Sequence, residues 1–230
     1  LKLGAEYQRY RLDDWWPPVA NSTSMSPLTF KNINNGQRDR YDVFTEWEAK
    51  WNQTWMTQFG LRHSTVRMDA DDVQGYKGLS DAGTEAADAV QFNSLNHQKT
   101  DRNLDATALT RFTPNNTSIY EAAYSIKNRS PNLYERYTWS HQSSMDMNMN
   151  NWVGDGNGYV GNLNLKPETA HTLSLMGEWH DAGQEKWNLR ISPYYTYVQD
   201  YIDAVSCGSL YSGCPNRSGG MNDNFVNLSL

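Results

Sequence analysis

Four side chains in the segment 129–166 have the types and spacing of a soft-metal site. Three methionines alternate with other residues and a histidine precedes them, giving the set His141, Met145, Met147 and Met149. Thioether sulfur is a soft ligand that selects Cu(I), and imidazole also binds copper. These residues are therefore candidate copper ligands. Met spacing fixes no coordination geometry, so the alternative of adaptable apolar contacts within a packed loop stays open.

The same segment is rich in large aromatic side chains that suit contact with a ligand. The candidates are Trp139, Trp152 and Tyr159. Trp and Tyr join an apolar ring to a polar tip, so they suit places that are apolar on one side and wet on the other. We expect them to form part of a substrate-capturing loop. Ordinary packing within that loop is the alternative for each of them.

Cys207 and Cys214 are the only cysteines of the chain, and they lie close together in a stretch rich in Gly and Ser. This spacing suits a disulfide within one loop, in an oxidising compartment. The alternative is a pair of unbridged thiols at the surface.

No arrangement of residues nominates a catalytic centre. The five histidines are scattered, and the sequence contains no H-E-x-x-H motif, nucleophile elbow or phosphate-binding loop. We therefore expect neither enzymatic activity nor a cofactor. A net charge of -6 and a pI of about 5.3, without a visible basic stripe, also argue against a nucleic-acid partner.

The composition restricts the fold class. Hydrophobic residues make up 38% of the chain and the mean hydropathy is -0.79. No apolar run reaches the roughly 18 residues that a transmembrane helix needs. Aromatic residues make up 13% of the chain, which argues against disorder because disordered chains are poor in aromatics.

The elements that must position the candidate residues are β-strands, because apolar and polar residues alternate over long stretches. In 41–51, for example, Val43, Trp47 and Trp51 share one face, and charged residues dominate the other. The same period of two recurs in 1–7, 55–61, 104–112, 120–126, 173–179 and 187–197, and a last strand begins near 225. Pro193 has no N–H to donate, so we expect a bulge or break there.

The connections between these strands alternate in length. Short turns are expected at 52–54, 114–116 and 180–186, and long loops at 15–37, 70–98, 129–166 and 206–224. In an up-and-down antiparallel sheet, this order places every long loop at one end and every short turn at the other. That asymmetry is typical of outer-membrane barrels.

Aromatic residues of the apolar face flank each short turn. They are Trp51, Trp55, Phe112, Tyr120, Trp179 and Trp187. Such a row at one level is typical of the aromatic girdle at a membrane interface. A soluble β-sandwich also alternates apolar and polar residues, but it gives no reason for the long loops to share one end.

Three segments in the second half of the chain carry a family resemblance. Residues 162–171 (NLNLKPETAH), with the motif Leu165, Lys166, Pro167 and Glu168, resemble a loop-to-strand motif of TonB-dependent outer-membrane receptors. Residues 127–137 (KNRSPNLYERY) and 193–202 (PYYTYVQDYI) resemble the segments before and after it. The order matches, and the resemblance covers the chain from about residue 38 onward.

The resemblance implies a transmembrane barrel of about 22 antiparallel strands, closed by an N-terminal plug domain. Residues 1–230 would supply about eight of those strands, with long extracellular loops and short periplasmic turns. We therefore expect a part of the β-barrel domain only. The plug domain, the TonB box that receives energy from the inner membrane, and the final strands would be absent.

The function that follows from the resemblance is active uptake across the bacterial outer membrane. The expected partners are outer-membrane lipid, the TonB complex through the missing N-terminal part, and an extracellular metal chelate, such as a ferric siderophore, or another large nutrient. The alternatives are a TonB-dependent copper receptor, a passive porin or adhesin barrel, and a soluble carbohydrate-binding β-domain.

Overall fold

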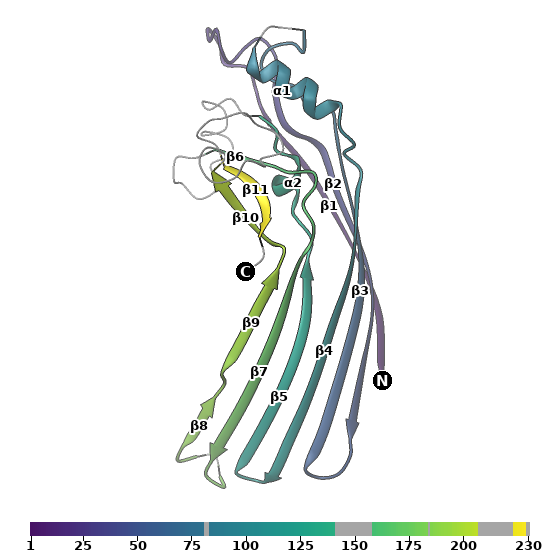
Figure 1. Cartoon of the computed structure of the whole chain (residues 1–230), viewed down its shortest axis with the longest axis vertical. Helices are drawn as coiled ribbons and strands as arrows, with labels where there is room; N and C mark the ends of the chain where they lie inside the picture. Colours follow the sequence, from purple (N-terminus) through teal and green to yellow (C-terminus); the bar gives the residue numbers. More distant parts are fainter. Residues whose placement is uncertain (81–82, 141–157, 184, 207–222, 229–230) are drawn as a thin grey trace.

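The computed structural model describes residues 1–80, 83–140, 158–183, 185–206 and 223–228, and its main feature is one long antiparallel sheet (Figure 1). Its strands are β1 (Lys2–Trp16), β2 (Phe30–Lys50), β3 (Trp55–Asp71), β4 (Lys99–Asn115), β5 (Ser118–Arg129), β7 (Glu168–His180), β8 (Asn188–Ile191) and β9 (Tyr194–Gln199). Neighbours in the sheet follow chain order, and β8 and β9 both pair with β7. The predicted up-and-down arrangement is confirmed, as an open part of a barrel.

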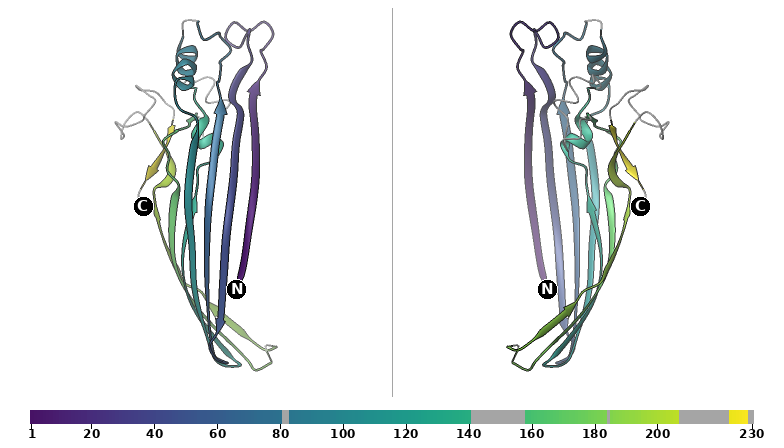
Figure 2. Two further views of the ribbon diagram at one scale, coloured as in Figure 1. Left: turned by 90° about the vertical axis from the view of Figure 1, so that its right-hand side faces the viewer. Right: turned by 90° about the vertical axis from the view of Figure 1, so that its left-hand side faces the viewer.

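A smaller sheet and two helices lie at the end of the main sheet that carries the long connections (Figures 1 and 2). The small sheet contains β6 (Tyr159–Val160), β10 (Tyr201–Ser206) and β11 (Asp223–Leu228). The helices are α1 (Thr84–Asn93) and α2 (Leu133–Tyr137). We call this end the loop end and the opposite end the turn end. None of the helices in the described ranges is long and apolar enough to cross a membrane.

The apolar face of the sheet is exposed, which agrees with a surface that faces lipid. Val43, Leu173 and Leu189 lie on three different strands and are 59%, 52% and 52% exposed. A sandwich would bury these side chains between two sheets. The exposed apolar face therefore excludes the soluble sandwich as the architecture of the main sheet.

The predicted aromatic row forms at the turn end. Trp55 stacks on Phe112 with ring centroids 4.5 Å apart, Phe112 lies 6.4 Å from Tyr120, and Tyr120 meets Trp179 edge-on at 5.8 Å. The indole N–H of Trp179 also donates to the Tyr120 hydroxyl at 3.1 Å. One continuous line of rings therefore crosses β3, β4, β5 and β7.

Two strand boundaries differ from the sequence prediction. β1 runs to Trp16 and β2 begins at Phe30, so both ends of the predicted loop 15–37 are strand and the connection itself is limited to residues 17–29. The alternation is lost there because β2 changes register between Asn34 and Gln37, with Asn35 in the left-handed region at φ 49°. A bulge of this kind shifts the side-chain period within a continuous strand.

The predicted break at Pro193 is confirmed, because β8 ends at Ile191 and β9 begins at Tyr194. A second bend follows at Asp200, which takes φ 52° between β9 and β10. The bend separates the main sheet from the small sheet.

An arginine in the middle of the apolar face is expected to destabilise the barrel in a bilayer. In the full-length barrel, Leu175→Arg places a charge among exposed apolar side chains of β7 and should destabilise the folded state by about 2–4 kcal/mol. Guanidinium unfolding in phospholipid vesicles measures the free energy. The matched control is Ser174→Arg on the polar face. Equal losses from both variants would contradict an apolar face that meets lipid.

Candidate functional site

The largest buried cluster of the described residues lies where the loops fold onto the polar face of β2 and β3. Its members include Phe30, Ile33, Val66, Met68, Val73, Tyr76, Phe92, Leu133, Tyr137, Trp139 and Leu163. They come from the ends of two strands, from both connections that contain a helix, and from the segment after 158. The connections at this end therefore form a packed layer, which we call the loop layer.

Helix α2 is the ordered centre of the loop layer, and its sequence fixes its start. The Asn132 side chain accepts from the Glu135 N–H at 2.8 Å, and the Glu135 carboxylate accepts from the Asn132 N–H at 2.7 Å. This reciprocal pair is a capping box, which satisfies amides that the first turn of a helix leaves unpaired. The helix spans only five residues, so the box and the packing around it must stabilise it.

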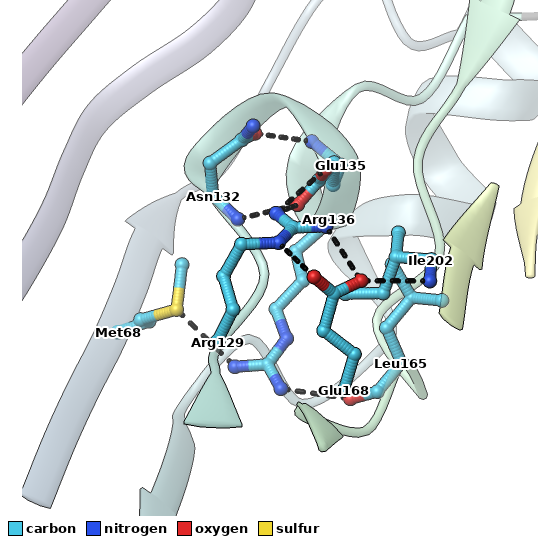
Figure 3. A network of polar contacts seen from close by, with 8 residues as sticks. All are labelled: Met68, Arg129, Asn132, Glu135, Arg136, Leu165, Glu168 and Ile202. Carbon is cyan, nitrogen blue, oxygen red and sulfur yellow. Dashed lines mark hydrogen bonds and ion pairs between the residues drawn. The ribbon is translucent and has the colours of Figure 1, made fainter. Parts of the chain in front are cut away.

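Arg129, at the end of β5, connects the capping box to β7 (Figure 3). Its Nη1 donates to both carboxylate oxygens of Glu135 at 3.0 Å, and its Nε and Nη2 donate to Glu168 at 2.7 and 3.2 Å. One planar guanidinium thus holds two carboxylates, a geometry that lysine does not provide. The helix that begins the long connection and the strand that follows this connection are therefore both bound to the Arg129 side chain.

Glu168 also reaches the small sheet. Its second oxygen accepts from the backbone N–H of Ile202 at 3.1 Å, on β10. The first residue of β7 therefore joins three elements: the end of β5, helix α2 through Arg129, and β10. Any displacement of the loop relative to the sheet breaks one of these hydrogen bonds.

Arg136 makes the most deeply buried ion pair of the loop layer. Its side chain is 2% exposed and that of Asp101 is 8% exposed, with Nη2 and Oδ1 2.8 Å apart. The same nitrogen donates to the Leu165 carbonyl at 2.7 Å, and Nη1 lies 3.2 Å from the Met68 sulfur (Figure 3). Removing one member of a buried pair leaves an uncompensated charge, which costs about 3–5 kcal/mol.

Glycine is required where the chain passes α2 again. A Cβ on Gly161 would lie 2.8 Å from the Arg136 carbonyl carbon and from the Thr138 oxygen. The Gly161 N–H donates to that Thr138 oxygen at 2.8 Å, and the Asn162 N–H donates to the Glu135 carbonyl at 2.8 Å. The segment before the LKPE motif is thereby bound to the helix by its backbone.

The motif residues divide into buried and exposed positions. Leu165 is buried with Tyr159 and Ile202 in a second cluster, Lys166 is exposed, and Pro167 precedes β7. Proline is tolerated at the beginning of a strand and keeps the preceding residue extended. The motif thus works as a junction: its leucine packs, its proline starts the strand, and its glutamate binds Arg129.

The predicted substrate aromatics that the structure describes are buried. Trp139 is 2% exposed, stacks on Phe30 at 5.2 Å and donates its indole N–H to the Lys31 carbonyl at 3.0 Å. Tyr159 is 7% exposed in the second cluster. In this arrangement neither ring presents an open face to a ligand, so both support the loop layer, and their contact with a substrate remains a prediction.

The other predicted site residues lie outside the described ranges. They are His141, Met145, Met147, Met149 and Trp152, and the pair Cys207 and Cys214. Across the ranges that are described, no group of three or more His, Cys, Asp or Glu side chains is placed to hold a metal ion. The copper site and the disulfide therefore stay predictions.

Sequence reasoning missed the roles of Arg129, Glu135, Arg136 and Asp101. One signal was available: Asn132 followed three residues later by Glu135 is the pattern of a capping box. The pairing of Arg136 with Asp101 joins positions 35 residues apart, and nothing in the spacing points to it.

On the polar face beneath the loop layer, Arg38 differs from the neighbouring arginines because it has no carboxylate partner among the described residues. Arg40 pairs with Asp42 at 2.8 Å, and Arg129 and Arg136 have the carboxylate partners given above. Within the described part of the chain, Arg38 forms no ion pair, and its buried Nε lacks a hydrogen-bond partner. A buried donor without a partner favours an anionic or polar ligand at this place.

Comparison with known proteins identifies what this architecture is similar to. The family model described as "TonB dependent receptor-like, beta-barrel" matches residues 1–228. A search of curated protein sequences finds no significant match.

Three solved structures match this chain, and the two with TM-scores above 0.5 share its fold. "Copper transporter OprC" matches with a TM-score of 0.59 and 15% identity, over 98% of this chain and 29% of that one. The hemophore receptor HasR of Serratia marcescens, in complex with HasA and heme, matches with a TM-score of 0.56 and 13% identity, over 97% and 34%. The siderophore receptor PirA from Pseudomonas aeruginosa matches with a TM-score of 0.44 and 13% identity, over 87% and 39%. The chain thus spans about a third of the length of these structures.

Loss of the Arg129 guanidinium is expected to loosen the loop layer. Arg129→Gln leaves Glu135 and Glu168 without their shared cation, so backbone amides of 130–138 and 158–168 should exchange with deuterium at least about tenfold faster. Hydrogen exchange with mass spectrometry on the full-length protein measures the rates. Arg111→Gln is the matched control, because Arg111 is similarly exposed, 45% against 44%, and pairs with Glu121 away from the loop. Unchanged exchange rates in Arg129→Gln would refute the stabilisation of the loop layer by Arg129.

The connection that contains α1 should be less stable at higher pH because of Glu85. Burial raises the pKa of Glu85, whose carboxylate accepts from the Tyr76 N–H. A raised pKa means that the stabilising contribution is complete below the ordinary value of 4.5 and is lost as pH rises through the raised value. Protection of 73–93 against exchange, corrected for intrinsic rates, should therefore fall with rising pH.

Glu85→Gln retains an acceptor oxygen without the titration, so it should remove most of this pH dependence. Asp88→Asn on the same helix serves as the control and should retain it. A wild-type profile that is flat above pH 4.5 would refute the assignment.

Proposed function

Since this chain belongs to the TonB-dependent receptor family, with residues 1–228 in its β-barrel domain, we propose that it forms wall and outer loops of a bacterial outer-membrane receptor for a metal chelate. A ferric siderophore is the preferred substrate class. In the full-length protein, energy would come through TonB, and a plug domain would close the lumen.

Membrane placement is supported by the two faces of the sheet. The exposed apolar face would contact lipid, and the polar face, with Arg62, Asp105 and Lys127, would contact water or the plug. Only a closed barrel satisfies the backbone of strands in lipid, so other parts of the full-length barrel would pair with the edges of this sheet. The turn end would face the periplasm and the loop end the outside.

The observation that carries the proposal is the packed loop layer above the polar face. The network of Arg129, Glu135 and Glu168 fixes the layer to three strands before any substrate arrives. A preformed surface loses little conformational freedom when it binds, which favours capture of a dilute ligand.

Arg38 supports an anionic substrate. It lies on the polar face under the loop layer, within electrostatic reach of Arg40, Arg129 and Arg136 and of the Asp101 carboxylate, which is already paired with Arg136. Chelates that hold a hard metal ion through anionic oxygen donors could accept hydrogen bonds from this cluster.

A copper receptor is the second candidate. It is supported by the alternation of Met145, Met147 and Met149 after His141, which are soft ligands for Cu(I). The two candidates make opposite predictions for copper accumulation in the double variant Met147→Ala with Met149→Ala.

Uptake of a labelled chelate tests the proposal. Cells that lack their other iron receptors would produce the full-length protein and receive a panel of radioiron-labelled siderophores, with haem and copper as further substrates. We expect uptake of at least one ferric chelate that disappears when TonB is deleted. Arg38→Gln should raise the half-saturating concentration about tenfold through loss of a charged hydrogen bond, whereas Lys50→Gln near the turn end should not. Uptake without TonB would indicate a passive pore.

The copper alternative is separated by Met147→Ala with Met149→Ala. On the preferred reading this double variant keeps ferric chelate uptake. A fall in copper accumulation in the same cells, without any ferric uptake by the wild type, would favour copper instead.

A further inference from the structure

The apolar face ends in a cluster of arginines on β1 to β4, close to the loop end. In the register of the strands, Arg9 lies opposite Asp39, Asp39 opposite Arg67, and Thr65 opposite Arg102. Arg11 lies on the same face. All four arginines therefore point to the side of the sheet that carries the exposed apolar residues, and not to the polar side under the loop layer.

The carboxylates of Asp39 and Asp69 lie in the same area, and that of Asp39 is already hydrogen-bonded to side chains of β1. Asp39 accepts two hydrogen bonds from Arg11, both at 2.9 Å, and one from the Tyr7 hydroxyl at 3.3 Å. Asp69 accepts from the Ala70 N–H at 3.0 Å. The patch carries four arginines and two aspartates. The next positions toward the loop end include Asp13 and Asp71, which both accept from Asn35, at 2.7 and 3.0 Å, so the excess of positive charge is limited to the level of the arginines.

The remaining guanidiniums are available to a ligand. Arg9, Arg67 and Arg102 are exposed, and none of them takes part in an ion pair with a described carboxylate. Arg67 lies over the Tyr41 ring, with its Cζ 5.8 Å from the centroid. Arg67 and Arg102 line one shallow pocket with Asp39, Thr65 and Asp69.

The height of this arginine patch matches the level of lipid headgroups. On β4, ten positions separate Arg102 from Phe112 in the aromatic row at the turn end. That is about 33 Å along the strand, or about 25 Å along the membrane normal at a tilt of about 40°, the usual height of the apolar band. The arginines therefore lie where the opposite membrane interface would begin.

The surface directly below the arginine patch suits acyl chains. Tyr7 and Tyr41 stack with centroids 5.0 Å apart, and Val43 and Leu104 follow toward the turn end, both exposed. Farther along the sheet, outward positions slightly nearer the turn end than Arg102 are neutral: Asn128, beside Leu104, bonds Thr169, and His171, opposite Ile126, bonds Tyr124. Among the described outward positions of β5, β7 and β9 there is no arginine or lysine, so within the described strands the positive charge of this face lies on β1–β4.

We propose that Arg9, Arg67 and Arg102 bind the phosphate groups of an outer-leaflet lipid whose acyl chains lie on the apolar face below. The inference rests on the proposed membrane placement of the sheet. Guanidinium groups bind phosphate oxygens by paired, charge-assisted hydrogen bonds, and each basic residue near an anionic lipid surface adds appreciably to binding. The tyrosines hold the boundary between headgroup and hydrocarbon.

Lipid binding to the purified full-length receptor tests this proposal without TonB or substrate. Diphosphorylated lipid A in nonionic detergent would be titrated and the bound lipid counted by native mass spectrometry, with lipid A stripped of its phosphates as the matched ligand. Arg67→Gln with Arg102→Gln should bind the phosphorylated lipid about 30-fold more weakly than the wild type. Lys50→Gln with Lys127→Gln removes two charges from the polar face and should bind like the wild type.

Each other outcome overturns the proposal. Equal affinity of the wild type and the arginine variant, or equal binding of both lipid forms, would exclude recognition of the lipid phosphate by this patch. Displacement of the lipid by millimolar inorganic phosphate as readily as by more lipid A would indicate a free-anion site instead. A shift between heated and unheated bands in electrophoresis verifies that each variant is folded. Because this assay needs no transport, a failure of the uptake proposal would leave its result unchanged.

Discussion

The alternation of side chains along each strand is the constraint on which the whole arrangement depends. Because neighbouring residues point to opposite faces, one register error would exchange the apolar and polar sets of a strand. The structure keeps this separation through the middle of the sheet, where Val43 and Leu173 point to one side and Asp42 and Ser174 to the other. At the loop end the two faces differ. The polar face is covered by the loop layer, and the apolar face is bordered by the arginine patch.

The loop layer replaces the buried core that a soluble domain would form between two sheets. The main sheet exposes its apolar face, so the burial that orders the chain is concentrated where connections fold onto strand ends. Two arginines hold carboxylates there, Arg136 pairing with Asp101 and Arg129 with both Glu135 and Glu168. Such pairs add little net stability compared with apolar packing, but they tolerate few alternative arrangements. They therefore favour one fixed position of the loop over the polar face of the sheet.

The sequence predicts the sheet well because its signals are local. The period of two, the aromatic flanks of the short turns and the proline at position 193 act within a few residues, and the structure bears each of them out. Prediction failed at residues 30–37, where the bulge at Asn35 interrupts the period. It also missed the ion-pair network, since Arg129 and Glu168 are 39 positions apart and meet only when β5 and β7 pair. The LKPE motif was visible as a pattern, but its physical role depends on that pairing.

The two ends of the apolar face differ in chemistry, and this difference follows from what each end must do. At the turn end, a line of rings from Trp55 to Trp179 marks the interface without charge. At the loop end, Tyr7 and Tyr41 mark it together with guanidiniums. Aromatic rings tolerate any headgroup, whereas arginine on a lipid-facing surface is stable only where it meets water or an anion. Three of the four arginines at this height have no ion-pair partner among the described residues, which favours a phosphate-rich leaflet on that side and gives the sheet an orientation independent of its loops.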